Sequence, residues 1–124
     1  MRRRGSYWEK QAMKYLRRQG LKLICRNYLC PLGEVDLIMR HHDTLVFVEV
    51  RFRAASGWVS AAESVTLAKQ RKVIRAAAHY LQRHQRYANM PCRFDVLAIS
   101  QSAAGTDKPA FDWIPAAFDA SFYD

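Results

Sequence analysis

The chain is organised around residues 33–53, which read GEVDLIMRHHDTLVFVEVRFR. Two runs rich in apolar and β-branched residues, 33–39 and 44–53, have the composition and alternation of β-strands. The polar stretch between them, residues 40–43, has the length of a hairpin connection. The sequence therefore predicts a β-hairpin here.

Charged residues interrupt both predicted strands. Because side chains alternate between the two faces of a strand, Asp36 shares a face with Glu34, and Glu49 shares a face with Arg51 and Arg53. Carboxylates on otherwise apolar strands are costly to bury, so they require either a structural or a chemical reason.

Length and charge limit the class of protein. The 124 residues predict a single domain, 1–124, with a basic tail at 1–5 and an exposed loop at 101–109. Twenty Lys and Arg against eleven Asp and Glu give a net charge of +9. Such a surplus favours a polyanionic partner, with nucleic acid the first candidate and a merely basic soluble protein the alternative.

Some classes are excluded by the sequence. Three cysteines without paired spacing argue against a disulfide framework and a structural zinc site. The basic start is not followed by an apolar stretch, so neither a signal peptide nor a membrane span is expected. A cytoplasmic protein is the default expectation.

The remaining elements follow from periodicity and from Gly and Pro positions. They give an α/β protein of order α-β-β-β-α-β-β, in which helices cover one mixed sheet in two or three layers. The expected elements are a helix at 6–19, strands at 21–27, 33–39 and 44–53, a helix from Ser64 or Thr66 to about 84, a strand at 93–100, and an edge strand at 111–114 before a turn at 115–118.

Each helix carries residues open to two interpretations. Ser6 and Glu9 have the spacing of a capping box, which would give Glu9 a purely structural role. On the second helix, four basic residues lie off the apolar stripe and form either a solvated face or, with Arg53, a phosphate-binding surface. These four are Lys69, Arg71, Lys72 and Arg75.

Two carboxylates beside a cation predict a specific chemistry. Asp36 and Glu49 repel each other unless a cation neutralises them, and Mg²⁺ (or Mn²⁺) takes hard oxygen ligands of this kind. Such a metal would polarise a phosphodiester and activate water, while Arg51 stabilises the developing charge. Ordinary ion pairing between Glu49 and Arg51 or Arg53 is the alternative explanation.

The chain resembles the UPF0102 family over nearly its whole length. The resemblance is carried by SYWEKQA (6–12), GEVDLI (33–38), FVEVRFR (47–53), Lys69, RFDV (93–96) and the ending at 113–118. It implies a restriction-endonuclease-like PD-(D/E)xK fold and a likeness to archaeal Holliday-junction resolvases. By position it also implies that Glu9, Asp36 and Glu49 hold the metal and that Arg51 occupies the last motif position.

That last position departs from the family pattern, which usually has Lys where this chain has Arg51. Arginine does not release its proton in proteins and so cannot act as a general base. It can still orient water or stabilise charge on a phosphate, and Lys69 can supply an ammonium group if it reaches the site.

Three functions remain open at this level. The first is a metal-dependent endonuclease acting on DNA, with branched or recombination intermediates as candidate substrates. The second is a non-catalytic nucleic-acid-binding module with a degenerate nuclease site, and the third is a protein-interaction domain. A homodimer is a further expectation, with the apolar end at 111–123 as the candidate interface.

Overall fold

The computed structural model describes residues 3–53, 63–101 and 109–120, with the backbone alone for residues 3–6, 53 and 101. The elements are α1 (Arg3–Arg18), β1 (Lys22–Cys30), β2 (Gly33–His41), β3 (Thr44–Arg53), α2 (Leu67–Arg83), the 3₁₀ turn η1 (Gln85–Tyr87), β4 (Cys92–Gln101) and β5 (Pro109–Phe118). The α/β class and the predicted order of helices and strands are confirmed, with η1 as an addition.

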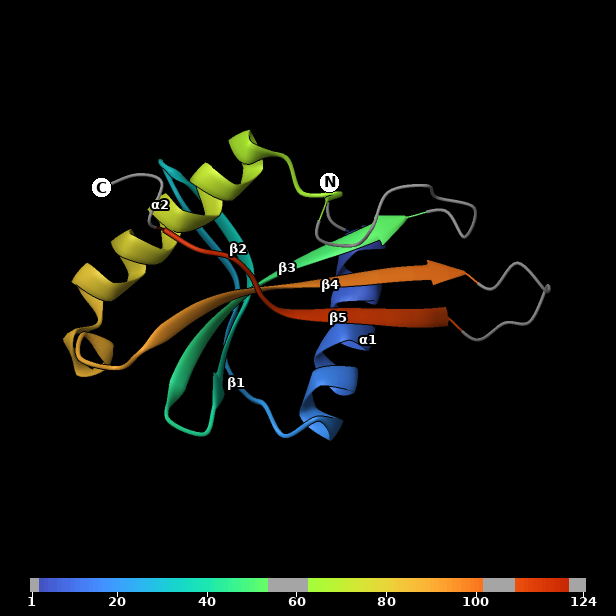
Figure 1. Ribbon diagram of the computed structural model, residues 1–124, viewed down its shortest axis with the longest axis horizontal. Helices are drawn as coiled ribbons and strands as arrows, with labels where there is room; N and C mark the ends of the chain where they lie inside the picture. The colour runs from blue at the N-terminus through green and yellow to red at the C-terminus, as the bar shows by residue number, and fades with distance from the viewer. Residues whose placement is uncertain (1–2, 54–62, 102–108, 121–124) are drawn as a thin grey trace.

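The strands form one five-stranded sheet in the order β1-β2-β3-β4-β5 (Figure 1). The β3–β4 pair is parallel, and the other three pairs are antiparallel. A parallel pair needs a crossover connection, and the segment containing α2 provides it. The sheet is therefore mixed, as the sequence predicted.

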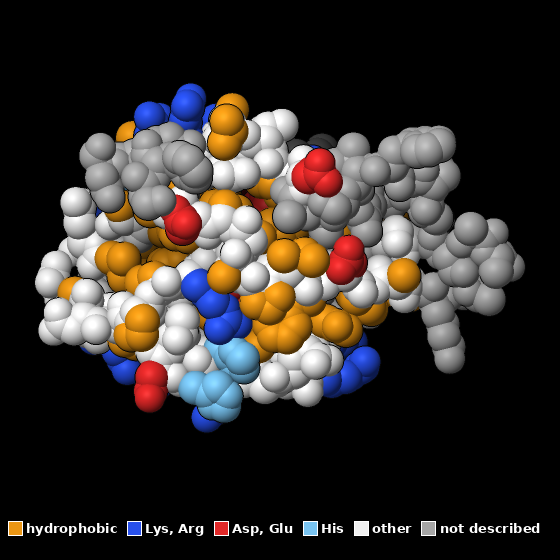
Figure 2. Space-filling view, viewed as in Figure 1, with side chains coloured by type: hydrophobic (Ala, Val, Ile, Leu, Met, Phe, Trp, Pro, Cys, Tyr) orange, Lys and Arg blue, Asp and Glu red, His pale blue; other side chains and the backbone are white. Residues whose placement is uncertain are grey.

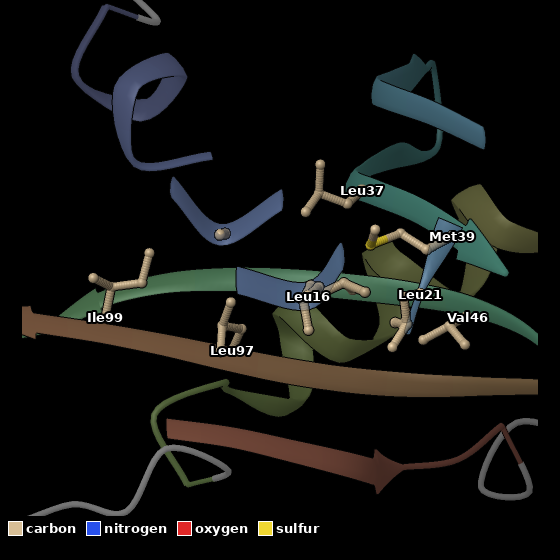
Figure 3. Close-up of a cluster of buried hydrophobic side chains, with 9 residues drawn as sticks. Leu16, Leu21, Leu37, Met39, Val46, Leu97 and Ile99 are labelled. Carbon is tan, nitrogen blue, oxygen red and sulfur yellow. The ribbon is translucent and has the colours of Figure 1, made fainter. Parts of the chain in front are cut away.

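The two helices cover opposite faces of this sheet. On one face, Ala12 and Leu16 of α1 pack against Leu37, Val48 and their neighbours, a cluster shown in Figure 3. On the other face, α2 packs against the residues that alternate with these. That second cluster includes Ile38, Leu45, Phe47, Val73, Ala76, Ala77 and Tyr80. The architecture is thus three layers, helix–sheet–helix. Helix α2 covers the face of the sheet toward which Phe47 and Glu49 point.

The first helix begins earlier than predicted. Because α1 starts at Arg3, Ser6 lies inside the helix and not at its N-cap, so the capping-box interpretation of Ser6 and Glu9 is wrong. The end of the helix is as expected: Gly20 follows it with φ +99°, a conformation that glycine adopts without steric cost.

Two strands continue three or more residues past their predicted ends. Residues 28–30 continue β1 because they pair with β2, and only Pro31 and Leu32 remain as the turn of a first hairpin. Likewise β5 continues through Pro115, which was assigned to a terminal turn, to Phe118. In both places pairing with a neighbouring strand overrides a local proline signal.

Other expectations agree with the structure or lie outside its described part. The turn between β2 and β3 is shorter than predicted, since β2 continues to His41 and leaves only His42 and Asp43, while β3 begins at Thr44 as expected. All three cysteines are free thiols. The connection predicted at 54–60 and most of the loop at 101–109 lie outside the described residues. Among the described helices, none has the length and apolarity needed to cross a bilayer.

Candidate active site

The predicted carboxylates lie where the β2–β3 ladder stops. The last backbone pair on this side is Leu37 with Val48, and Asp36 and Glu49 are the next residues on the two strands. Beyond that pair, the backbone N–H of Val50 donates to Asp36 Oδ2 at 2.8 Å. The Asp36 carboxylate therefore accepts the hydrogen bond that a backbone carbonyl would accept if the two strands stayed paired.

Both carboxyl groups are buried. Asp36 is 8 % exposed and Glu49 only 2 %. Burial raises the pKa of Glu49 to about 8, and the adjacent charge of Asp36 acts in the same direction. Burial also raises the pKa of Asp36, while the hydrogen bond from Val50 and the charge of Lys69 oppose that shift. Burial and mutual repulsion therefore both oppose ionisation of the two carboxyl groups together.

Two cations approach the Glu49 carboxylate from different elements. Lys69 Nζ, on α2, lies 3.9 Å from Glu49 Oε2, and Arg51 Nη1, two residues along β3, lies 3.7 Å from the same oxygen. Lys69 Nζ also lies 3.5 Å from Glu34 Oε1. The expectation that Lys69 could reach the site thus has a geometric basis.

The start of α2 fixes the position of Lys69. Thr66 is the N-cap, and its hydroxyl accepts the backbone N–H of Lys69 at 3.2 Å, as one of the two capping options predicted. One turn further on, Gly33 lies against the backbone of Lys72, where a Cβ on Gly33 would stand 2.3 Å from the Lys72 carbonyl oxygen. The second turn of α2 therefore rests directly on the hairpin that carries Glu34.

The other predicted site residues lie on the two helices and at the end of β3. Glu9 is buried at 4 % exposure on α1, the helix that covers the opposite face of the sheet from α2. Arg71, Lys72 and Arg75 are exposed on α2, and Figure 2 shows a group of Lys and Arg side chains at the upper margin of the molecule. The side chain of Arg53 lies outside the described residues.

The donor set can be tested against the predicted metal. Within residues 3–53, 63–101 and 109–120, no three His, Cys, Asp or Glu side chains are arranged to hold a metal ion. The Asp36–Glu49 pair nevertheless suits a hard cation, because Glu49 Oε1 is buried and has no hydrogen-bond partner among the described residues. The role of Glu9 as a third ligand stays a prediction.

A further buried carboxylate, in addition to Glu9, Asp36 and Glu49, lies on β4. Asp95 is fully buried on β4 and accepts hydrogen bonds from Arg93, from Trp113 Nε1 at 3.0 Å and from the backbone N–H of Ala116 at 2.9 Å. The sequence signal was an aspartate in the middle of an apolar strand. With all its oxygens satisfied, Asp95 supports the β4–β5 pairing and is not a candidate ligand.

Comparison with known proteins places this site in a family. The model of the uncharacterised protein family UPF0102 matches residues 8–99, a range that includes Glu9, Asp36, Glu49 and Lys69. The chain belongs to the UPF0102 family. The resemblance noted from the sequence is thereby confirmed.

Relatives in the UPF0102 family cover almost the whole chain. A UPF0102 protein of Pseudomonas syringae pv. syringae is 50 % identical over 116 residues, which are 94 % of this chain and 93 % of that protein. A UPF0102 protein of Nitrosomonas europaea is 47 % identical over 118 residues, 95 % of each chain. A third, of Cupriavidus metallidurans, is 49 % identical over 123 residues, 98 % of this chain and 85 % of that protein.

Proposed function

We propose that this UPF0102 protein is a divalent-metal-dependent endonuclease that hydrolyses DNA phosphodiester bonds, with branched or recombination intermediates as candidate substrates. The observation that carries this proposal is the buried Asp36–Glu49 pair at the parting of β2 and β3, with Lys69 and Arg51 beside it. A five-stranded mixed sheet between two helices is compatible with the restriction-endonuclease-like fold, which forms part of the proposal.

Asp36 and Glu49 would hold Mg²⁺ or Mn²⁺, with Glu9 as a candidate third ligand. When bound, such a metal supplies Lewis-acid polarisation of the phosphate and lowers the pKa of an attacking water. The Val50 N–H holds one Asp36 oxygen, which restricts rotation of the carboxyl group and so limits where the second oxygen can lie. The protein's contribution is thus a preformed pair of oxygens on rigid strands.

The cations have separate tasks in this proposal. Lys69 would balance the charge of Glu49 and also approach a phosphate oxygen, because its ammonium group has three N–H donors. Arg51 can orient the phosphate or stabilise its added charge, and it cannot remove a proton from water. The basic outer edge of α2, with Arg71, Lys72 and Arg75, would hold the sugar–phosphate backbone.

The direct test is metal-dependent nicking of supercoiled and four-way-junction DNA. We expect Asp36→Asn and Glu49→Gln each to reduce cutting by about 100-fold or more, because each removes a charged oxygen ligand. Asp43→Asn is the matched control, since the Asp43 carboxylate is 96 % exposed at the turn after β2. Equal cutting by Asp36→Asn and Asp43→Asn would contradict the assignment.

One observation favours a second function, a non-catalytic nucleic-acid-binding module. Lys69 and Arg51 both lie within 4 Å of Glu49, so two cations already stand beside the carboxyl pair without a metal, and arginine stands at the family's usual lysine position. Under this alternative the protein binds DNA with steep salt dependence and cuts no substrate with either metal. Arg51→Lys discriminates: a gain of cutting shows that arginine had silenced a nuclease site.

A further inference from the structure

A hollow of about 250 Å³ adjoins the proposed reaction centre. This is below the roughly 300–1,000 Å³ of pockets for drug-sized ligands, and it suits a group the size of a single nucleotide. The residues that line the hollow come from the β1–β2 turn and the first turns of α2. They are Leu29, Cys30, Pro31, Leu32, Gly33, Glu34, Lys69 and Lys72.

The apolar side chains at the rim of the hollow are exposed to solvent. Leu29 is 72 % exposed and Leu32 is 53 % exposed, although both are large aliphatic side chains. The turn that carries them is anchored, because Leu29 pairs with Glu34 and Gly33 touches the backbone of Lys72. Leu29, at the end of β1, and Leu32, in the turn, therefore form an exposed apolar surface that is held in place by the hairpin.

The same hollow is connected to the carboxyl pair through Lys69. The Lys69 ammonium group lines the hollow and lies 3.9 Å from Glu49 Oε2. Glu34, the other contact of Lys69, also lines the hollow. A ligand seated between the two leucines and Lys72 would therefore sit next to a phosphate held at Lys69.

We infer that the β1–β2 turn contacts a nucleobase that has left its stack, and that it directs the protein to nucleic acid with a break in helical stacking. This inference rests on the proposed nucleic-acid function. Leu29 and Leu32 would cover the base face, while Lys72 and Lys69 take the flanking phosphates. In an uninterrupted duplex each base face is already covered by its neighbours, so aliphatic wedges gain contact where stacking is broken or readily opened.

The test uses a four-way DNA junction with 2-aminopurine at the branch point and a linear duplex with the same label and local sequence. The reporter brightens when its base leaves the stack. The wild-type protein is expected to raise the junction signal, to leave the duplex signal unchanged, and to bind the junction more tightly. The double variant Leu29→Ser/Leu32→Ser is expected to lose the rise and about tenfold of the preference for the junction.

Leu67→Ser is the matched control, because Leu67 is 58 % exposed on α2 and does not line the hollow. Thermal unfolding verifies that each variant is folded, and Leu29→Ser alone replaces the double variant if the latter is not. The inference is overturned if the leucine variant keeps the signal and preference of Leu67→Ser. It is also overturned if that variant alters only self-association in sedimentation, which would identify a second copy as the occupant.

The two proposals fail in distinguishable ways. If wild-type protein binds neither DNA at any salt concentration, the proposed function fails and the inference fails with it. If wild type binds and the leucine variant behaves as the control does, the inference alone fails.

Discussion

Among the described residues this chain buries four carboxyl groups, and at three of them, Asp36, Glu49 and Asp95, the burial is compensated to different degrees. Asp95 accepts from three donors and is fully satisfied. Asp36 has one backbone donor, and Glu49 has two cations beyond 3.5 Å and an oxygen without a hydrogen-bond partner among the described residues. Of these three, Glu49 at the proposed reaction centre is the least compensated, as expected where function outweighs stability.

The raised pKa of Glu49 predicts a pH-dependent stability. Between its ordinary value near 4.5 and its folded value of about 8, the folded state keeps a proton that the unfolded chain has lost. The free energy of unfolding therefore falls as pH rises through this window, by up to about 1.4 kcal/mol per pH unit, and levels off above it. Urea unfolding at several pH values should show this decline in wild type and a weaker one in Glu49→Gln.

The exposed carboxylate of Asp43 gives the comparison for that experiment. Asp43→Asn should follow the wild-type pH profile, because the Asp43 side chain is 96 % exposed and lies outside the buried carboxyl pair. If wild type and Glu49→Gln decline in parallel from about pH 5 to 8, the Glu49 carboxyl is not the titrating group.

At the scale of elements, two contacts fix how neighbouring elements meet, one between two strands and one between a hairpin and a helix. The β4–β5 ladder shifts between Phe94 and Val96, and the Asp95 carboxylate takes the Ala116 N–H that the shift leaves unpaired. On the other side of the molecule, Gly33 allows the β1–β2 hairpin to touch α2. Each contact depends on one residue type at one position.

Asp95→Ala should be among the most destabilising single changes in the chain. It leaves the Trp113 N–H and the Ala116 N–H without their acceptor and removes the partner of Arg93, which we expect to cost about 3–5 kcal/mol. Denaturant unfolding measures the loss. Asp43→Ala, at the exposed turn, should stay within about 0.5 kcal/mol of wild type; a similar small loss for Asp95→Ala would refute the structural role.

Gly33→Ala should affect both stability and the site. The added Cβ would meet the Lys72 carbonyl, so α2 must move away from the hairpin at an expected cost of about 1–3 kcal/mol. Because Lys69 is one turn before Lys72, the shift should also weaken cutting or junction binding. Asp43→Ala, at the exposed turn after β2, lies outside the hollow and should leave both measurements nearly unchanged.

At the scale of the whole molecule, positive charge lies on both helices and so on both outer layers. Arg71 and Arg75 are exposed on α2, and Lys10 and Lys14 are exposed on α1. The acidic pair lies on the α2 side of the sheet, since Glu49 alternates with residues of the α1 cluster along β3. A nucleic acid approaching the site would therefore meet the α2 surface first.

This arrangement predicts which charges set the salt dependence of binding. Arg71→Ala/Arg75→Ala should lower the slope of log K against log salt by about two, one for each lost phosphate contact. Lys10→Ala/Lys14→Ala removes the same charge from the other layer and should change the slope much less. Fluorescence anisotropy with a short DNA duplex over a salt series measures both; equal slopes would place the polyanion elsewhere.

Local patterns were sufficient for much of this fold. Alternation along residues 44–53 and the cap at Thr66 are properties of neighbouring residues, and both elements lie where the sequence placed them. Predictions failed where a distant partner decided the outcome. Strand pairing extended β1 past residue 27 and carried β5 through Pro115, although the local proline signal indicated a turn.

The sequence by itself determined the α/β class, the order of elements, the family and the choice of Asp36 and Glu49 as the carboxylates to explain. It did so because periodicity and motif spacing are local. Only the tertiary structure decided that Asp36 and Glu49 stand side by side where a ladder ends, that Lys69 reaches across from α2, and that Asp95 is satisfied. Those facts depend on strand register and on helix docking at Gly33, which join residues far apart in the chain.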